Sequence, residues 1–196
     1  MSQNTEGLSF HPEKQVSFPE LTTERLILRK FRPDDIEWVY QGLSHRDVIR
    51  YYGVSYDSLE AAKEQMDWFV SIEKEEKGIW WAVCCKNRHI FLGGIGFNNW
   101  DKENRKTEMG YWLLPEHWGS GIIKEAGLAA CEYAFQIMSV HRIEAMVETE
   151  NLNSKKIMYK LNFELEGVMR DCEIKGGKFV SLEMYAKLSD VGIYDG

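Results

Sequence analysis

Residues 110–121 read Gly-Tyr-Trp-Leu-Leu-Pro-Glu-His-Trp-Gly-Ser-Gly, and this stretch does most to decide the fold. It joins a short apolar run to a turn that opens a helical segment. Gly119 and Gly121 remove side chains where the backbone must approach a ligand closely, and the first N–H groups of the following helix would point at that ligand. Because the N-terminal end of a helix also carries a partial positive charge, the stretch predicts an anion site suited to a pyrophosphate.

Other known phosphate-binding turns match this stretch less well. A dinucleotide-binding fingerprint would place glycine or alanine three residues after Gly121, where Lys124 stands, and a P-loop would need a Gly-Lys-Ser/Thr sequence that the chain lacks. A pair of glycines one residue apart can also mark no more than a flexible helix start, so the anion site depends on the motifs around it.

The segments on either side of this turn alternate between strand and helix periodicities. Upstream, apolar runs predict three antiparallel strands at 79–85, 90–97 and 107–114, with turns at 87–88 and 98–105. Downstream, apolar spacing predicts a central helix at 122–138, whose buried face would include Ile137. The other expected elements are a strand at 26–29, helices at 32–43 and 58–77, a strand at 142–147, a short helix at 154–161, and a hairpin of 163–169 with 179–186 around Lys175-Gly176-Gly177.

The expected fold class is α/β (α+β), with a mixed sheet and helices on both of its faces. The helix at 58–77 is expected to begin at Ser58 as its N-cap and to bury Leu59, Phe69 and Val70.

Length and composition indicate one domain. With 196 residues, of which 44% are hydrophobic, the chain can bury one substantial core but falls short of two average domains. Residues 1–20 are polar and contain Pro12 and Pro19, so they are expected to form a flexible arm before a single domain at 21–188 and a tail at 189–196.

The charge and the cysteines exclude several classes of function. A net charge of −7 argues against nucleic acid as the main partner, because phosphate binding needs a basic face. An acidic chain suits a cationic amine substrate, although moderate acidity is also ordinary among soluble proteins.

Without a signal peptide or membrane span, a cytoplasmic location and no membrane partner are expected. No metal site is expected, and free buried thiols are, because zinc-site and CxxC spacings are missing around Cys84, Cys85, Cys131 and Cys172.

Five segments, two of which overlap residues 110–121, follow one another in the order and spacing of a known family. They are Leu21-Thr22-Thr23-Glu24-Arg25-Leu26-Ile27-Leu28-Arg29, Glu108-Met109-Gly110-Tyr111-Trp112-Leu113, Trp118-Gly119-Ser120-Gly121 with Glu125-Ala126, Asn151-Leu152-Asn153-Ser154, and Glu166-Gly167-Val168 with Arg170. Together they resemble the GNAT superfamily of N-acetyltransferases, and within it the ribosomal-protein N-terminal (RimJ/RimL-like) branch. The resemblance implies a mostly antiparallel sheet of about six or seven strands, with splayed fourth and fifth strands that admit acetyl-CoA.

The resemblance also implies which residues form the site. Backbone N–H groups around Leu113 and Leu114 would polarise the thioester, and Asn151 would bond the pantetheine arm. The residues implied in binding acetyl-CoA, without a metal, are Leu113, Leu114, Trp118, Gly119, Ser120, Gly121, Ile122, Asn151, Asn153 and Ser154. Tyr51 and Tyr52 are implied to wall the acceptor pocket, while Trp80, Trp81 and Trp100 are each more typical of a core.

Two residues are candidates for catalysis. Ser154 corresponds to a serine near the CoA sulfur, although it could also be a first-turn serine, with Asn153 as the cap that leaves it free. Glu108, on the strand expected to line the amine's path, is the candidate base, although a glutamate at a strand start is often only solvated. Many other family members use a tyrosine five residues before the phenylalanine that follows this helix, and here that position is Met158, one residue before Tyr159.

Two further departures concern the turns. Glu116 stands where the superfamily often has Gln or Arg, which should weaken phosphate attraction slightly. Asn162 replaces the glycine of the usual Gly-Phe, and asparagine tolerates positive φ, so that turn can survive.

An acetyl-CoA-dependent N-acetyltransferase is therefore expected, in which a primary amine attacks the thioester directly. The expected acceptor is a protein N-terminal α-amino group of the ribosomal-protein type. A small amine such as an amino acid, a polyamine or an antibiotic is the alternative acceptor, and a CoA-binding module without turnover is the alternative from another class. An oligomer is compatible with the sequence.

Overall fold

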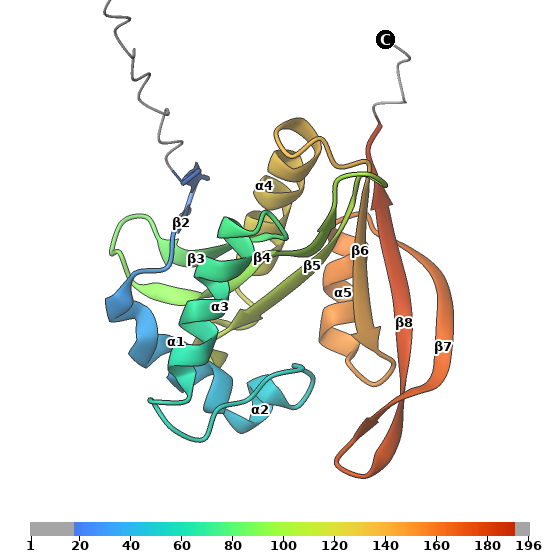
Figure 1. The fold of residues 1–196 in the computed structure, drawn as a ribbon, viewed down its shortest axis with the longest axis horizontal. Helices are drawn as coiled ribbons and strands as arrows, with labels where there is room; N and C mark the ends of the chain where they lie inside the picture. The colour runs from blue at the N-terminus through green and yellow to red at the C-terminus, as the bar shows by residue number, and fades with distance from the viewer. Residues whose placement is uncertain (1–17, 191–196) are drawn as a thin grey trace, which may run out of the picture.

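The computed structural model describes residues 18–190, which form one open eight-stranded sheet with helices on both faces (Figure 1). In chain order the elements are β1 (Leu21–Thr22), β2 (Leu26–Arg29), the 3-10 turn η1 (Pro33–Asp35), α1 (Ile36–Ser44), α2 (Arg46–Ile49), α3 (Ala62–Lys74), β3 (Ile79–Cys85), β4 (Phe91–Asp101), β5 (Lys106–Leu113), the 3-10 turn η2 (Pro115–His117), α4 (Ile122–Gln136), β6 (Arg142–Glu148), α5 (Leu152–Lys160), β7 (Glu164–Lys175) and β8 (Lys178–Leu188).

The strand order across the sheet is β1-β2-β3-β4-β5-β6-β8-β7, and all neighbours are antiparallel except β5 and β6. These two strands pair in parallel over three positions, ending with Glu108 opposite Glu144. Beyond that pair they part, although β5 continues to Leu113 and β6 to Glu148. The expected splay is therefore confirmed, and the short strand β1 is the eighth strand that the sequence did not predict.

Around β3 the sheet is buried on both faces, and successive side chains of this strand point to opposite faces. Trp81 packs in a core with residues of α4 and α5, whereas its neighbour Trp80 packs in a second core with α1 and α3. Figure 1 shows α1, α2 and α3 gathered beside the half of the sheet that contains β3 and β4, with α5 beside β6. The first core contains residues of both β5 and β6, so it continues across the point where these strands part.

Several helix boundaries and faces differ from expectation. Ser58 lies in a turn before α3, where its Oγ accepts a hydrogen bond from the Ala61 N–H (3.2 Å), and the helix itself begins at Ala62. Val70 is 55% exposed and Leu59 43%, so Phe69 is the predicted core residue that α3 does bury. Gln65, Phe69 and Ile72 lie on the inner face of α3, and Val70 points away from it because successive helix residues are turned by about 100°. Leu59 lies before the start of the helix.

Other differences concern turns and helix ends. The expected helix at 32–43 consists of η1 followed by α1, and His45, whose backbone is extended (ψ 121°), separates α1 from the short helix α2. β4 continues to Asp101, so the turn before β5 is shorter than 98–105. Ile137 lies just past α4 and is 66% exposed, rather than on the helix's buried face. The hairpin around Gly176 and Gly177 is confirmed, and both glycines have positive φ.

The ends of the domain and its thiols add detail. The described residues begin at Phe18, and the Pro19 carbonyl accepts a hydrogen bond from Trp81 Nε1 (2.8 Å). Residues 1–17 and 191–196, which hold most of the expected arm and tail, lie outside the described residues. The four cysteines are free thiols; Cys84 and Cys131 are buried as expected, whereas Cys85 is partly exposed and Cys172 is exposed. Within 18–190, no helix has the length and apolarity to cross a bilayer.

Candidate active site

Two cavities meet where β5 and β6 part. The first, of about 760 Å³, lies between the Trp118–Gly121 loop, the start of α4 and the start of α5. The second, of about 590 Å³, lies between β3, β5, β6 and the segment that follows α2. Five residues line both cavities and form their common wall: Tyr51, Tyr52, Tyr111, Asn151 and Ser154.

The loop before α4 has the backbone that the two glycines predict. Gly119 and Gly121 have φ of +74° and +78°, and Gly121 is the N-cap of α4. A Cβ added at Gly119 would meet nothing within 4 Å, so both glycines expose backbone to the first cavity, which they line. Glycine adopts this left-handed conformation without the steric cost that other residues pay, which leaves the loop open for a close ligand.

Hydrogen bonds and an ion pair around Glu125 connect this loop to the residues just before β2. The Arg25 guanidinium forms an ion pair with Glu125 (Nε to Oε2, 2.6 Å) and donates to the Ser120 carbonyl (3.1 Å). The Thr23 hydroxyl and the Arg25 backbone N–H both donate to the other oxygen of Glu125. Burial alone would raise the pKa of Glu125, but these hydrogen bonds outweigh it and hold the pKa below its usual value.

The first cavity is predominantly basic, although the chain as a whole is acidic. Four cationic side chains line it against two carboxylates, Asp47 and Glu150; the cations belong to Arg50, Lys124, Lys156 and Lys160. Composition could not reveal this local excess. The spacing of Lys156 and Lys160 on α5 was the available signal, because residues four apart lie on the same side of a helix.

Most of the predicted acetyl-CoA residues line the first cavity, but two do not. Those that do are Leu113, Trp118, Gly119, Gly121, Ile122, Asn151, Asn153 and Ser154. Leu114 is buried in the core, and its N–H already donates to the Leu92 carbonyl (2.9 Å), so it has no free N–H for a thioester. The Ser120 hydroxyl donates to the His117 carbonyl and stabilises the loop from outside the cavity.

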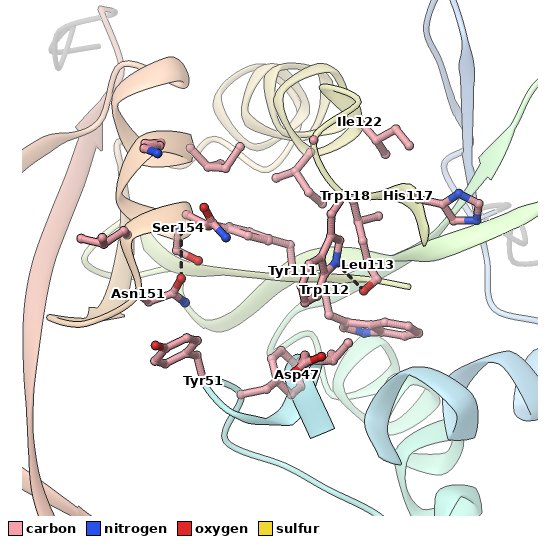
Figure 2. Close-up of a pocket in the computed structure, with 18 of the residues that line it drawn as sticks. Asp47, Tyr51, Tyr111, Trp112, Leu113, His117, Trp118, Ile122, Asn151 and Ser154 are labelled. Carbon is pink, nitrogen blue, oxygen red and sulfur yellow. Dashed lines mark hydrogen bonds between the residues drawn. The ribbon is translucent and has the colours of Figure 1, made fainter. Parts of the chain in front are cut away.

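The start of α5 corrects the expected cap. Asn151, not Asn153, is the N-cap, because its side-chain oxygen accepts a hydrogen bond from the Ser154 N–H (3.1 Å; Figure 2). Ser154 therefore occupies the third position of the helix, where its backbone is satisfied and its hydroxyl is available at the common wall. The sequence predicted that the Ser154 hydroxyl would be free of a capping role, as the structure shows. It predicted Asn153 as the cap, however, and the cap is Asn151.

The second cavity is acidic and aromatic. Three carboxylates line it, those of Glu64, Glu108 and Glu148, and no lysine or arginine is among its described lining residues. Glu108 belongs to the last β5–β6 pair, and its Oε2 accepts a hydrogen bond from Asn99 Nδ2 (2.9 Å). The structure therefore places Glu108 in the second cavity, away from the loop before α4.

Aromatic rings complete the second cavity. Tyr51, Tyr52, Tyr56, Trp68 and Trp80 line it, and Trp68 packs edge-on against Trp80 with ring centroids 5.8 Å apart. Trp80 lies directly on β5, because a Cβ at Gly110 would come within 2.8 Å of its ring. Of the tryptophans singled out in the sequence, Trp80 lines the cavity and Trp81 is core.

Tyrosine placement differs from the pattern seen in many family members. Met158 is fully buried and lines the second cavity, whereas Tyr159 is 59% exposed and packs its ring against Tyr185. Tyr111 is the tyrosine that reaches the common wall, and it comes from β5 rather than α5. Burial raises the pKa of Tyr111 to about 12, and the neighbouring Ser154 hydroxyl offsets part of that rise.

No group of three or more His, Cys, Asp or Glu side chains within 18–190 is arranged to hold a metal ion. The first cavity combines an excess of cationic side chains with the exposed backbone of the glycine loop, both of which favour phosphate groups.

Comparison with known proteins agrees with this geometry. Residues 25–164 match the family model described as "Acetyltransferase (GNAT) domain". The Bacillus subtilis protein named "Uncharacterized N-acetyltransferase YoaA" is 33% identical over 170 residues, which cover 86% of this chain and 96% of the relative. The Escherichia coli "Ribosomal-protein-serine acetyltransferase" is 29% identical over 99 residues, covering 50% of this chain and 55% of the relative.

A solved structure extends the likeness at the level of the fold. The Vibrio cholerae spermidine N-acetyltransferase, in complex with CoA and spermine, superposes with a TM-score of 0.76 over 85% of this chain and 96% of its own, at 19% identity. The fold, the open glycine loop and the matches across most of the chain lead to one conclusion: this chain belongs to the GNAT family of N-acetyltransferases.

Proposed function

We propose that this chain binds acetyl-CoA in the first cavity and acetylates a primary amine held in the second. The observation that carries the proposal is the opposite charge of two cavities that share one wall. A basic cavity attracts the phosphates of CoA, and an acidic, aromatic cavity attracts an ammonium group. The relatives named as acetyltransferases support acetyl transfer as the reaction.

Each part of the first cavity has a role in binding acetyl-CoA. The loop from Trp118 to Gly121 would hold the pyrophosphate on its exposed backbone, and Lys124 would add a positive charge one turn into α4. Asn151 and Asn153 would bond the pantetheine arm, and Leu113 would lie beside the thioester. Acetyl-CoA itself supplies the activated acetyl group.

In the second cavity, Glu108 is the proposed base. Its carboxylate lines the cavity at the position where β5 and β6 separate, so an entering amine would pass close to it. An aliphatic ammonium must lose a proton before it can attack a carbonyl, and Glu108 would accept that proton directly or through a water molecule. Tyr51 and Tyr52 would wall the acceptor at the shared boundary.

For the acceptor, we propose a protein N-terminal α-amino group. The Escherichia coli relative named for ribosomal-protein serine acetylation supports this choice. A polyamine is the second candidate, because Glu64 and Glu108 line one cavity together; the third carboxylate, Glu148, forms an ion pair with Lys175 (2.8 Å). The spermidine N-acetyltransferase shares the fold of this chain, which is compatible with a polyamine acceptor.

The test is a panel of acceptors with acetyl-CoA, in which N-terminal peptides and small amines including spermidine are compared by mass spectrometry and CoA thiol release. Peptide products would support the first candidate, and acetylated polyamines the second. If CoA binds but no amine in the panel yields product or thiol, the proposal of turnover fails.

Charge variants sharpen this test. Glu64→Gln should raise the acceptor KM about fivefold, as expected for about 1 kcal/mol of attraction between charges near a solvated surface. The effect should shrink with added salt. Glu132→Gln is the matched control, because Glu132 is exposed on α4 and lines neither cavity. Equal effects in the two variants would contradict the role of the second cavity.

A further inference from the structure

The Tyr111 hydroxyl is a buried polar group without a satisfying partner. Within 18–190, four buried side-chain polar atoms make no hydrogen bond of good geometry, namely Trp80 Nε1, Tyr111 OH, Trp112 Nε1 and His141 Nδ1. Leaving such a group unpaired costs about 1–3 kcal/mol, so each one calls for an explanation. Tyr111 is the residue among these four that lines both cavities.

The surroundings of Tyr111 indicate where its missing partner would lie. Figure 2 shows Tyr111 reaching from β5 toward Ser154 on α5, across the common wall. The Ser154 hydroxyl is close enough to lower the pKa of Tyr111, but the two hydroxyls do not meet in a full hydrogen bond. A third group placed between them could satisfy both, and the wall shared by the cavities is where a bound thioester would meet an amine.

Strand geometry separates this hydroxyl from the proposed base. Glu108 and Tyr111 are three residues apart on β5, so their side chains leave the strand on opposite faces. Glu108 lines only the second cavity, whereas Tyr111 packs against the core that holds α4 and α5 and also reaches the first. One strand therefore presents a proton acceptor on the amine side and a proton donor on the thioester side.

We propose that the Tyr111 hydroxyl, oriented by Ser154, donates its proton to the CoA sulfur as the carbon–sulfur bond breaks. This inference rests on the proposed function and adds a catalytic residue to it. The nitrogen–carbon and sulfur–hydrogen bonds form while the carbon–sulfur and one nitrogen–hydrogen bond break. The ammonium first loses one proton to Glu108, which releases it to solvent. The second proton that the nitrogen loses passes through cavity water to restore the Tyr111 hydroxyl, so protons balance over one turnover.

The buried setting suits a donor of this kind. With its pKa raised to about 12, Tyr111 keeps its proton throughout the working range of the enzyme. Because this donor stays protonated across the working range, it adds no high-pH limb to the rate, whereas a carboxylate base adds a low-pH limb. The hydroxyl also takes over a task that Met158, with no exchangeable proton, cannot perform from α5.

The test compares Tyr111→Phe with Tyr159→Phe, because the second tyrosine is exposed and lines neither cavity. Tyr111→Phe should lower kcat by about 10- to 100-fold with an unchanged KM for acetyl-CoA, the signature of an interaction made as charge develops. Its melting temperature should not fall, because the variant keeps the ring and removes an unsatisfied hydroxyl. A structural role would instead lower stability and leave turnover per folded molecule intact.

A second measurement needs no acceptor and so separates this inference from the proposed function. The thiol pKa of enzyme-bound CoA can be followed by its thiolate absorbance, or by its alkylation rate with iodoacetamide across pH. A donated hydrogen bond stabilises the thiolate, so the bound thiol should have a lower pKa in the parent and in Tyr159→Phe than in Tyr111→Phe. An identical thiol pKa in all three proteins would overturn the proposal, whatever amine the enzyme uses.

Discussion

Replacing Gly121 by valine tests the phosphate loop, and Gly177 offers a matched control. Gly121 has φ +78° at the start of α4, and Gly177 has φ +76° in the β7–β8 turn, far along the chain from the first cavity. A Cβ at Gly177 would meet nothing within 4 Å, and one at Gly121 would meet only the Arg25 guanidinium at 3.6 Å. Both substitutions therefore cause the same backbone strain, about 1–2 kcal/mol, without a clash in the free protein.

Their effects on CoA binding should differ sharply. Gly121→Val places a branched side chain where the phosphate must approach the backbone, which should remove at least one hydrogen bond to a charged group. Such a bond contributes about 1.5–3 kcal/mol, equivalent to roughly a 10- to 150-fold weaker Kd. Gly177→Val should bind CoA as the parent does.

Calorimetric titration with CoA gives the affinities, and thermal melting shows whether both variants lose similar stability. The interpretation of the loop would be refuted by undiminished CoA affinity in folded Gly121→Val. Equal weakening in both glycine variants would refute it too, because the cause would then be strain rather than contact with phosphate.

Three other predictions concern single side chains. Ser154→Ala should lower kcat by roughly tenfold with little change in the Kd of CoA, because the serine would act on developing charge; normal turnover in steady-state kinetics would reduce Ser154 to a helix residue. Glu108→Gln should lower kcat by about a hundredfold near neutrality and recover in part at high pH, where free amine is plentiful; a pH profile identical to that of the parent would rule Glu108 out as the base. Glu125→Gln should lower the melting temperature at neutral pH, because the folded pKa of Glu125 lies below its ordinary 4.5 and the stability gained from its ionised form is present above that value. As pH falls through the folded pKa this stability is lost, so the difference in melting temperature between the parent and Glu125→Gln should shrink as pH falls, and a constant difference across pH would contradict the ion pair with Arg25.

Cationic and anionic side chains are distributed unequally between the two cavities of the site. A chain of net charge −7 would repel the phosphates of CoA if its charges were evenly spread. The cations on α4, α5 and the segment after α2 gather around one cavity, while the carboxylates of α3, β5 and β6 gather around the other. In the proposed function, this charge distribution would attract each ligand to its own side of the wall that carries Tyr111 and Ser154.

The sequence by itself determined the family, the order of elements and the glycine loop. These features depend on local patterns: Gly119 and Gly121 allow positive φ within one turn, and the apolar spacing of β3, β4, β5 and α4 is read within a dozen residues. Helix boundaries were less predictable, as at Ser58, because a capping residue can also serve a turn that precedes the helix.

The tertiary structure alone decided which side chains meet. Lys124, Lys160 and Arg50 are far apart in sequence, and only the packing of three helices brings them to one cavity. Leu114 illustrates the reverse case: its position beside Leu113 suggested a free N–H, but pairing with Leu92 on β4 occupies it. In the sequence Tyr111 is only part of a strand motif. Its proposed role as a proton donor depends on the splay of β5 from β6 and on the distance to α5. Local patterns specify backbone conformation, whereas a reacting centre depends on contacts between segments that the chain brings together only after it folds.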